Sequence, residues 1–184
     1  MRVNISVFNF LFNLLFEFMY EVGFRWVHFG LESGSEKILK KIGKSMDISY
    51  IKQVIKEIRE IGYRVRTSFI LDYPGTTIED FNQTKDLILK LNPHEIRLHY
   101  LAYRPGTPVA HENPNKIVSS YIHSPKSESE LSYTKDILLF LQELEQLGYL
   151  VITKEQEWNI YNHLSKNQKF VSMVPMKYGM CWYE

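Results

Sequence analysis

One unit recurs along this chain: an amphipathic helix, then a glycine and an aromatic residue, then an apolar strand. It reads FEFMYEVGFRWVHFG over 16–30, IKQVIKEIREIGYRVRTSFIL over 51–71 and LLFLQELEQLGYLVIT over 138–153. In the second copy one helix face is apolar, formed by Ile51, Val54, Ile55, Ile58 and Ile61. Gly62 follows, where a left-handed residue commonly ends a helix. Helices that alternate with strands in this way predict βαβ units and a parallel sheet.

A fourth unit, TTIEDFNQTKDLILKLNPHEIRLHYL over 76–101, has Asn92 and Pro93 in place of the glycine. Thr76 and Glu79 stand at the spacing of a capping box, which predicts the start of its helix. The strands that we expect cover 25–30, 64–71, 96–102 and 149–153, and a short strand over 2–6 would also fit. In parallel sheets of this kind ligands bind at the carboxyl ends of the strands.

Charge and cysteine content exclude several classes of function. The 184 residues carry a net charge of +1, with basic and acidic residues interleaved, so nothing indicates capture of nucleic acid. The single cysteine, Cys181, excludes a disulfide framework and a cysteine-based metal site within the chain, and it agrees with a cytoplasmic location. The six histidines show no spacing typical of metal ligands, so we expect no metal site among them.

The first part of the chain is strongly apolar and aromatic, VNISVFNFLFNLLFEFMY over 3–20. Its apolar runs are interrupted by Asn4, Asn9, Asn13 and Glu17, and none approaches the roughly 20 residues of a membrane span. The small-residue cleavage site of a signal peptide is also missing. We therefore interpret this segment as a buried helix; if exposed, it would form a surface for aggregation or for a partner.

Polar residues follow the first expected strand, in GLESGSE over 30–36. A carboxylate at a strand end, here Glu32, can accept hydrogen bonds from ribose hydroxyls or from an ammonium group. The hydroxyls of Ser33 and Ser35 could bind carboxylate or phosphate oxygens. The alternative is structural, with Ser33 or Ser35 capping a helix that begins near Glu36.

Two further strand ends carry Pro-Gly corners, DYPGTT over 72–77 and YRPGTP over 103–108. The first fits a type II turn, and a purely structural corner is the alternative to a binding loop. Arg66 lies on the strand that leads into it and is a candidate for binding a carboxylate. Alternatively Arg66 faces outward beside Arg64, since the two residues alternate onto the same face.

Together these segments resemble the radical S-adenosylmethionine (SAM) superfamily, especially the branch whose members often carry a cobalamin-binding domain. The resemblance rests on FGLESGSEKILKKIGK over 29–44, RVRTSFILDYPGTTIEDF over 64–81 and LHYLAYRPGTPVAHE over 98–112. It implies the second half of a (β/α)6 core, a partial (β/α) barrel with parallel strands, corresponding to strands 3 to 6. The domain organisation that we expect is a partial core over 1–112, a polar linker over 113–134 and a small C-terminal α/β appendage, a helix–strand extension over 135–184.

The resemblance also implies a binding site for S-adenosylmethionine at the strand ends. By it, Glu32, Ser33 and Ser35 line the ribose and methionine ends, and Arg66 binds the methionyl carboxylate. The residues that would approach the adenosine are Ser68, Leu71, Asp72, Tyr73, Pro74 and Gly75, with Arg104 at the third turn. The sequence departs from the family where Asp72 replaces a usual glycine and Thr76 a usual glutamate. No catalytic residue is assigned.

The family's CxxxCxxC loop, which holds a [4Fe-4S] cluster, lies upstream of every segment matched here. A cluster needs three thiolates, and this chain has only Cys181, so we expect the isolated chain to bind no iron and to cleave no S-adenosylmethionine. It would then be a truncated product or gene remnant of a larger enzyme, in which cobalamin could also bind. Otherwise it would work with a second polypeptide that supplies the missing strands. Two other functions stay open: a non-catalytic partner-binding subunit, and an unrelated (β/α) enzyme acting on a phosphorylated or nucleotide ligand.

Overall fold

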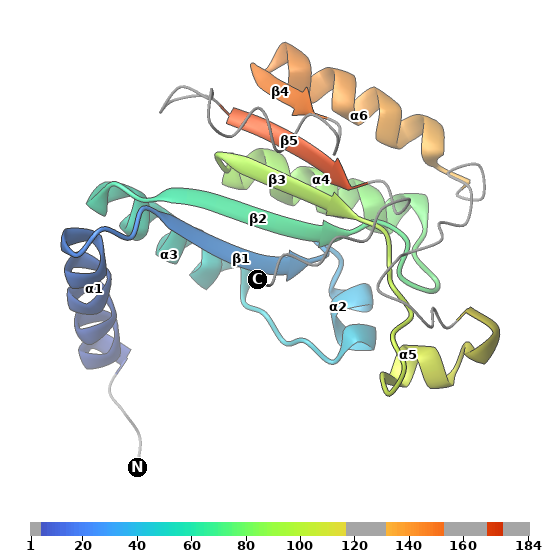
Figure 1. Cartoon of the computed structure of the whole chain (residues 1–184), viewed down its shortest axis with the longest axis horizontal. Helices are drawn as coiled ribbons and strands as arrows, with labels where there is room; N and C mark the ends of the chain where they lie inside the picture. The colour runs from blue at the N-terminus through green and yellow to red at the C-terminus, as the bar shows by residue number, and fades with distance from the viewer. Residues whose placement is uncertain (1–4, 117–131, 153–168, 175–184) are drawn as a thin grey trace.

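The structure is a computed structural model that describes residues 5–116, 132–152 and 169–174. Its helices and strands follow one another as the repeated unit predicts (Figure 1). In chain order they are α1 (Ile5–Glu21), β1 (Trp26–Glu32), α2 (Glu36–Ile42), α3 (Ile48–Ile61), β2 (Arg64–Ile70), α4 (Ile78–Leu91), β3 (Glu95–His99), α5 (Pro108–His111), a 3-10 turn (Pro114–Lys116), α6 (Thr134–Gln146), β4 (Tyr149–Ile152) and β5 (Lys169–Val174).

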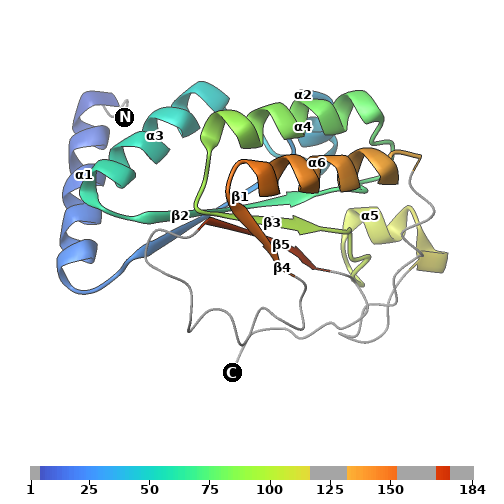
Figure 2. The same cartoon turned by 90° about the horizontal axis from the view of Figure 1, so that it is seen from above.

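The strands form one sheet in the order β1-β2-β3-β5-β4, and every neighbouring pair is parallel. Helices α2, α3, α4 and α6 all lie on the same side of this sheet (Figure 2). The carboxyl ends of β1, β2 and β3 therefore point the same way and are followed by the three polar turns. The prediction of a parallel α/β fold is confirmed, and one-sided helices are the arrangement of a barrel wall.

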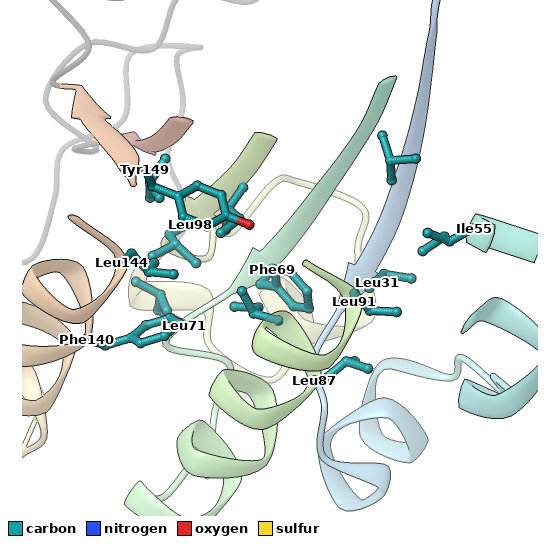
Figure 3. Close-up of a cluster of buried hydrophobic side chains, with 14 of the residues drawn as sticks. Leu31, Ile55, Phe69, Leu71, Leu87, Leu91, Leu98, Phe140, Leu144 and Tyr149 are labelled. Atoms are coloured by element: carbon teal, nitrogen blue, oxygen red, sulfur yellow. The ribbon is translucent and has the colours of Figure 1, made fainter. Parts of the chain in front are cut away.

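The core lies between the sheet and these helices (Figure 3). Phe69 and Leu98 from neighbouring strands are fully buried, and Leu87 and Leu91 from α4 pack over them. The largest fully buried side chains in the described part of the chain also include Phe140 of α6. At about 25 cal/mol per Å² of apolar surface, burial of this layer is the main stabilising contribution to the fold.

Helix boundaries follow the sequence signals, with one shift. Helix α3 buries Val54, Ile55 and Ile58, and Gly62 ends it in the left-handed conformation, with φ of 113°. The start of α4 is displaced by one residue from our expectation, because the capping box is formed by Thr77 and Asp80. The Thr76 and Glu79 prediction is therefore wrong: Thr76 belongs instead to the preceding turn, where its hydroxyl donates to the carbonyl oxygen of Tyr73 at 2.7 Å.

Two expectations about strands need correction. The short strand considered over 2–6 is wrong for its described residues, because residues 5 and 6 belong to α1, whereas residues 1–4 lie outside the described part. Strand β5 was not expected, and it inserts between β3 and β4. The described residues of the expected extension thus continue the same sheet, and the division into core, linker and extension stays a prediction; most of the linker, like Cys181, lies outside the described residues.

The apolar amino-terminal segment forms helix α1, which is only partly buried. Phe12, Phe16 and Met19 pack against the core, as a buried helix predicts. Leu14 and Phe18, on the same helix, are 53% and 60% exposed, so burial is one-sided. Within the described ranges, no helix combines the length and the apolar character that a membrane crossing requires.

Candidate functional site

The end of β1 carries an irregular backbone at Glu32. The pairing of β1 with β2 shifts register between Gly30 and Glu32, and Glu32 has a φ of 66°. A left-handed residue with a side chain is uncommon, and such positions concentrate at binding sites. Lys44 lies 3.5 Å from the Glu32 carboxylate and also donates to the carbonyl oxygen of Gly30. The Glu32 side chain keeps 26% of its surface exposed, so its carboxylate is accessible at the strand end.

The turn that follows is tied to α4 by hydrogen bonds. The Ser33 hydroxyl lies 3.3 Å from the Thr84 hydroxyl, and the Gly34 amide donates to the same oxygen at 2.9 Å. The Ser35 hydroxyl donates to Asp80 at 2.6 Å and accepts from the Ile38 amide as the cap of α2. Ser33 and Ser35 are 3% and 1% exposed. Both hydroxyls are thus engaged inside the protein, as the structural alternative predicts for Ser35, and their role in ligand binding stays a prediction.

The Asp80 carboxylate is the charged group in the contact between the β1 turn and α4. Its carboxylate accepts from Ser35 and Thr77 and lies 2.5 Å from the Lys37 ammonium group. Burial alone would raise the pKa of Asp80, but the hydrogen bonds from Lys37, Ser35 and Thr77 outweigh it and lower the pKa to about 2. The carboxylate is therefore charged at neutral pH and holds the β1 turn on the amino end of α4.

The turn after β2 has the type II form predicted from Pro74 and Gly75. The Thr76 amide donates to the carbonyl oxygen of Tyr73 at 2.9 Å, and Gly75 has a φ of 83°. This turn leans on α2, because the Tyr73 hydroxyl donates to the Lys41 carbonyl oxygen at 3.3 Å and the Lys41 ammonium group donates to Pro74 at 3.4 Å. The segments that follow β1 and β2 are thereby joined.

Asp72 joins the ends of β2 and β3. Its carboxylate accepts a hydrogen bond from the Leu101 amide, while the Leu71 amide donates to the His99 carbonyl oxygen at 2.7 Å. The buried Leu71 carbonyl oxygen also accepts from the Tyr133 hydroxyl. The carboxylate that replaces the family's usual glycine therefore has a structural partner inside the chain, and a contact of Asp72 with a ligand stays a prediction.

The turn after β3 repeats the turn after β2. The Thr107 amide and hydroxyl donate to the Arg104 carbonyl oxygen at 3.2 and 2.8 Å, and Gly106 has a φ of 83°. Burial, together with Glu112 and Tyr103 nearby, raises the pKa of the Tyr73 hydroxyl, so the second and third turns are electrostatic neighbours. Arg104 itself is exposed. The three turns thus follow one another along the same edge of the sheet.

The helix-free face of the sheet carries polar side chains that the sequence analysis did not single out. Glu95 is fully buried, and its two carboxylate oxygens accept from Arg66 at 2.5 Å and from Arg97 at 2.6 Å. His28 lies 3.1 Å from the Ser68 hydroxyl on the neighbouring strand. Arg66 and Ser68, which were predicted to contact the ligand, therefore share this face with Glu95, Arg97 and His28.

One pattern in the sequence could have identified some of these residues. In EIRLH over 95–99, charged and apolar residues alternate, which places Glu95, Arg97 and His99 on one face. Burial, then Arg97 and His28, lower the pKa of His99 to about 4, and burial with Arg66 and Arg97 also lowers the pKa of His28. Both imidazoles are neutral at pH 7, so the face can offer neutral nitrogens next to guanidinium groups.

The chemistry of these side chains fits parts of S-adenosylmethionine. Glu32 offers an accessible acceptor for hydroxyl or ammonium donors, and Arg66 offers a guanidinium group, although Glu95 already holds it. A metal cluster would need a group of ligand side chains that lie close together. The described ranges contain no group of three or more His, Cys, Asp or Glu side chains that could hold a metal ion.

Comparison with known proteins shows which family the first half of the chain resembles. Residues 1–88 match the family model of the Radical SAM superfamily. The threonylcarbamoyladenosine tRNA methylthiotransferase MtaB of Thermotoga maritima is 31% identical over 86 residues, which are 46% of this chain and 20% of that protein. The tRNA-2-methylthio-N(6)-dimethylallyladenosine synthase of Rickettsia canadensis is 38% identical over 87 residues, again 46% of this chain and 20% of that protein. The matched region thus spans about a fifth of the length of these curated relatives.

A solved structure shows the same fold. Coproporphyrinogen III oxidase (HemN) from Escherichia coli, described as a radical SAM enzyme, matches with a TM-score of 0.59. The match has 17% sequence identity and covers 88% of this chain and 40% of that one. It includes a parallel sheet with helices on one side, so the predicted partial barrel agrees with it. Residues 1–88 of this chain are therefore similar to the radical SAM superfamily.

Proposed function

We propose that this chain supplies S-adenosylmethionine-binding strand ends to a radical SAM core. The observation that carries the proposal is that the three turns are linked to one another at the carboxyl ends of β1, β2 and β3. Lys41 ties the first segment to Pro74 in the second, and Asp72 ties the second to Leu101 in the third. Turns that are braced against one another form a preorganised surface, which lowers the entropy cost of binding a ligand there.

The residues have distinct roles in this proposal. Glu32 accepts from the ribose hydroxyls or from the ammonium group, because its carboxylate is accessible and its left-handed backbone turns it away from regular strand geometry. Arg66 binds the methionyl carboxylate and shares its guanidinium group between that carboxylate and Glu95. The backbone of residues 71–75 lies against the adenosine. Ser33 and Ser35, whose hydroxyls have partners inside the protein, hold the loop that follows Glu32 in place.

An iron–sulfur cluster is implied only by the similarity to the radical SAM superfamily. Its chemistry, reductive cleavage of the sulfonium, needs a cluster held by three thiolates, and the 184 residues contain one cysteine. We infer that the thiolates come from residues outside this sequence, either from the same longer polypeptide or from a second one. The cobalamin-associated branch stays a prediction.

Calorimetry with S-adenosylmethionine tests the proposal. The Glu32→Gln variant keeps the shape of the side chain and removes its charge, so we expect binding to weaken by about tenfold through loss of a charge-assisted hydrogen bond. Glu36→Gln, four residues away on the exposed start of α2, is the matched control and is expected to bind as the wild type does. Equal affinity in both variants would contradict the assignment of Glu32. Iron analysis after reconstitution of the same samples is expected to show no stoichiometric cluster.

A second candidate function is that of a partner-binding subunit. It is favoured by strand β1, which lies at the lateral edge of the sheet. Among the described strands, β1 pairs only with β2, so its other side presents backbone groups for another strand. Exposed apolar side chains continue from α1 to the start of β1, at Leu14, Leu15, Phe18, Val22 and Phe24. This function by itself predicts no binding of S-adenosylmethionine by the wild-type chain, so the same calorimetry separates the two.

A further inference from the structure

A basic cavity of about 650 Å³ lies at the opposite end of the sheet from the candidate site. It forms where β1, β2 and β5 begin, next to α1 (Figure 1). Four cationic side chains line it: Arg25, Arg59, Arg64 and Lys169. None of the described residues that line it is Asp or Glu. The cavity is therefore suited to an anion, and the proposed function makes no use of it.

Neutral groups orient these cations toward one region. Arg25 lies 4.1 Å from the centre of the Tyr20 ring, and Arg64 lies 4.5 Å from the centre of the Trp26 ring. The Lys169 ammonium group donates to the side-chain oxygen of Asn92 at 2.7 Å. Rings and amide oxygens position a cation without cancelling its charge.

The pKa of His94 is affected by the cations that line the cavity. Its Nδ1 accepts from the Val65 amide at 3.0 Å, and burial followed by Arg59, Arg64 and Lys169 lowers its pKa to about 4. Three cations thus act on one side chain from different elements. The Nε of Arg59 is buried and has no hydrogen-bond partner within the described residues, although its Nη2 donates to the Asn92 carbonyl oxygen.

Glu95 is an acid that acts on one of these cations from the helix-free face of the sheet. Glu95 acts on Arg64, where it partly opposes the lowering of the pKa by burial. Glu95 is fully buried, however, and both of its oxygens already accept from Arg66 and Arg97 on the helix-free face. Both oxygens of Glu95 thus already have a guanidinium partner on that face.

We propose that this cavity binds a phosphate or diphosphate group of a small anion. Three guanidinium groups offer planar forks that match phosphate oxygens, and a multiply charged anion balances four cations better than a single carboxylate does. The volume exceeds what one phosphate needs, so the group can belong to inorganic diphosphate or to a nucleotide whose base lies near Tyr20 and Trp26.

Calorimetry of the 184-residue chain with inorganic pyrophosphate at low ionic strength tests this. We expect the double variant Arg25→Gln/Lys169→Gln to bind pyrophosphate about tenfold or more weakly than the wild type, because two charge-assisted contacts are lost. The matched control, Lys40→Gln/Lys135→Gln, removes the same charge from exposed positions on α2 and α6 and is expected to bind as the wild type does. Added salt is expected to weaken binding in all folded variants.

A parallel titration with ADP separates the sources of the phosphate group. Equal affinity for ADP and pyrophosphate indicates that the diphosphate alone is recognised, and tighter binding of ADP adds the aromatic residues. If melting shows that the double variant is unfolded, Arg25→Gln alone replaces it, since Arg25 is exposed. Absence of pyrophosphate binding in the wild type, or an equal loss in the cavity and control variants, overturns the proposal.

Discussion

Asp80 is a buried charged residue that holds the β1 turn against α4. It is 4% exposed and joins Ser35 of one segment to the start of α4, with Lys37 as its counter-ion. A buried carboxylate with several donors is more stable charged than neutral. The folded-state pKa of about 2 lies below the ordinary value of 3.8, so the charged form stabilises the fold. This stabilisation is complete above pH 3.8 and is lost as the pH falls through about 2.

The Asp80→Asn variant tests this linkage. A lowering of the pKa from 3.8 to about 2 corresponds to about 2 kcal/mol of unfolding free energy at neutral pH, which the variant loses. Urea unfolding of the wild type and the variant is expected to show this difference at pH 7 and a much smaller one at pH 2. Exposed Asp136→Asn, on α6, is the control and is expected to change little at either pH. A difference for Asp80→Asn that is independent of pH would contradict the account.

The conformation of a single residue could be predicted where neighbouring residues in the sequence determine it. Gly75 and Gly62 have the left-handed backbone that their turn and cap positions require. The partners of Ser33 and Ser35 were not predictable, because Thr84 and Asp80 lie 51 and 45 residues further along the chain. The burial of Glu95 likewise depends on a guanidinium group from another strand.

At the scale of elements, the contact between the β1 turn and α4 depends on Gly34. A Cβ at this position would lie 2.6 Å from the carbonyl carbon of Gln83 and 2.7 Å from the Cα of Thr84, both backbone atoms. The turn and helix would have to separate, so Gly34→Ala is expected to lower the unfolding free energy by more than about 2 kcal/mol. Urea unfolding measures this directly.

Gly43→Ala is the matched control for that substitution. Gly43 ends α2 with a φ of 77°, and a Cβ there meets nothing within 4 Å. Its alanine variant carries only the cost of a left-handed backbone, about 1 kcal/mol. If Gly34→Ala costs no more than Gly43→Ala, the close packing of the β1 turn on α4 is not a determinant of stability.

Most elements could be predicted because their patterns are periodic. The apolar face of α3 and the apolar strand after it identify one βαβ unit without further information. Strand β5 was missed because the sequence before it, over 153–168, lacks the glycine and aromatic pair of the repeated unit. Its position between β3 and β4 is decided by pairing with distant strands, which local sequence does not encode.

At the scale of the whole molecule, the chain presents a curved wall rather than a closed barrel. Helices α2, α3, α4 and α6 cover one face, and β1 ends the described sheet. Leu14 and Phe18, on the helix that precedes β1, are exposed. Covering that edge with further strands would bury apolar surface and satisfy backbone groups at the same time. The similarity of residues 1–88 to the radical SAM superfamily and the fold shared with HemN agree with this arrangement.

The central claim is that three strand ends form one S-adenosylmethionine site. Amide hydrogen exchange of the 184-residue chain, measured with and without saturating S-adenosylmethionine, tests it most directly. The account predicts slower exchange together in residues 30–36, 71–76 and 101–107, because one ligand would contact turns that are already braced against each other. Protection confined to a single turn, protection only around the basic cavity at Arg25 and Arg64, or no change at all would contradict it.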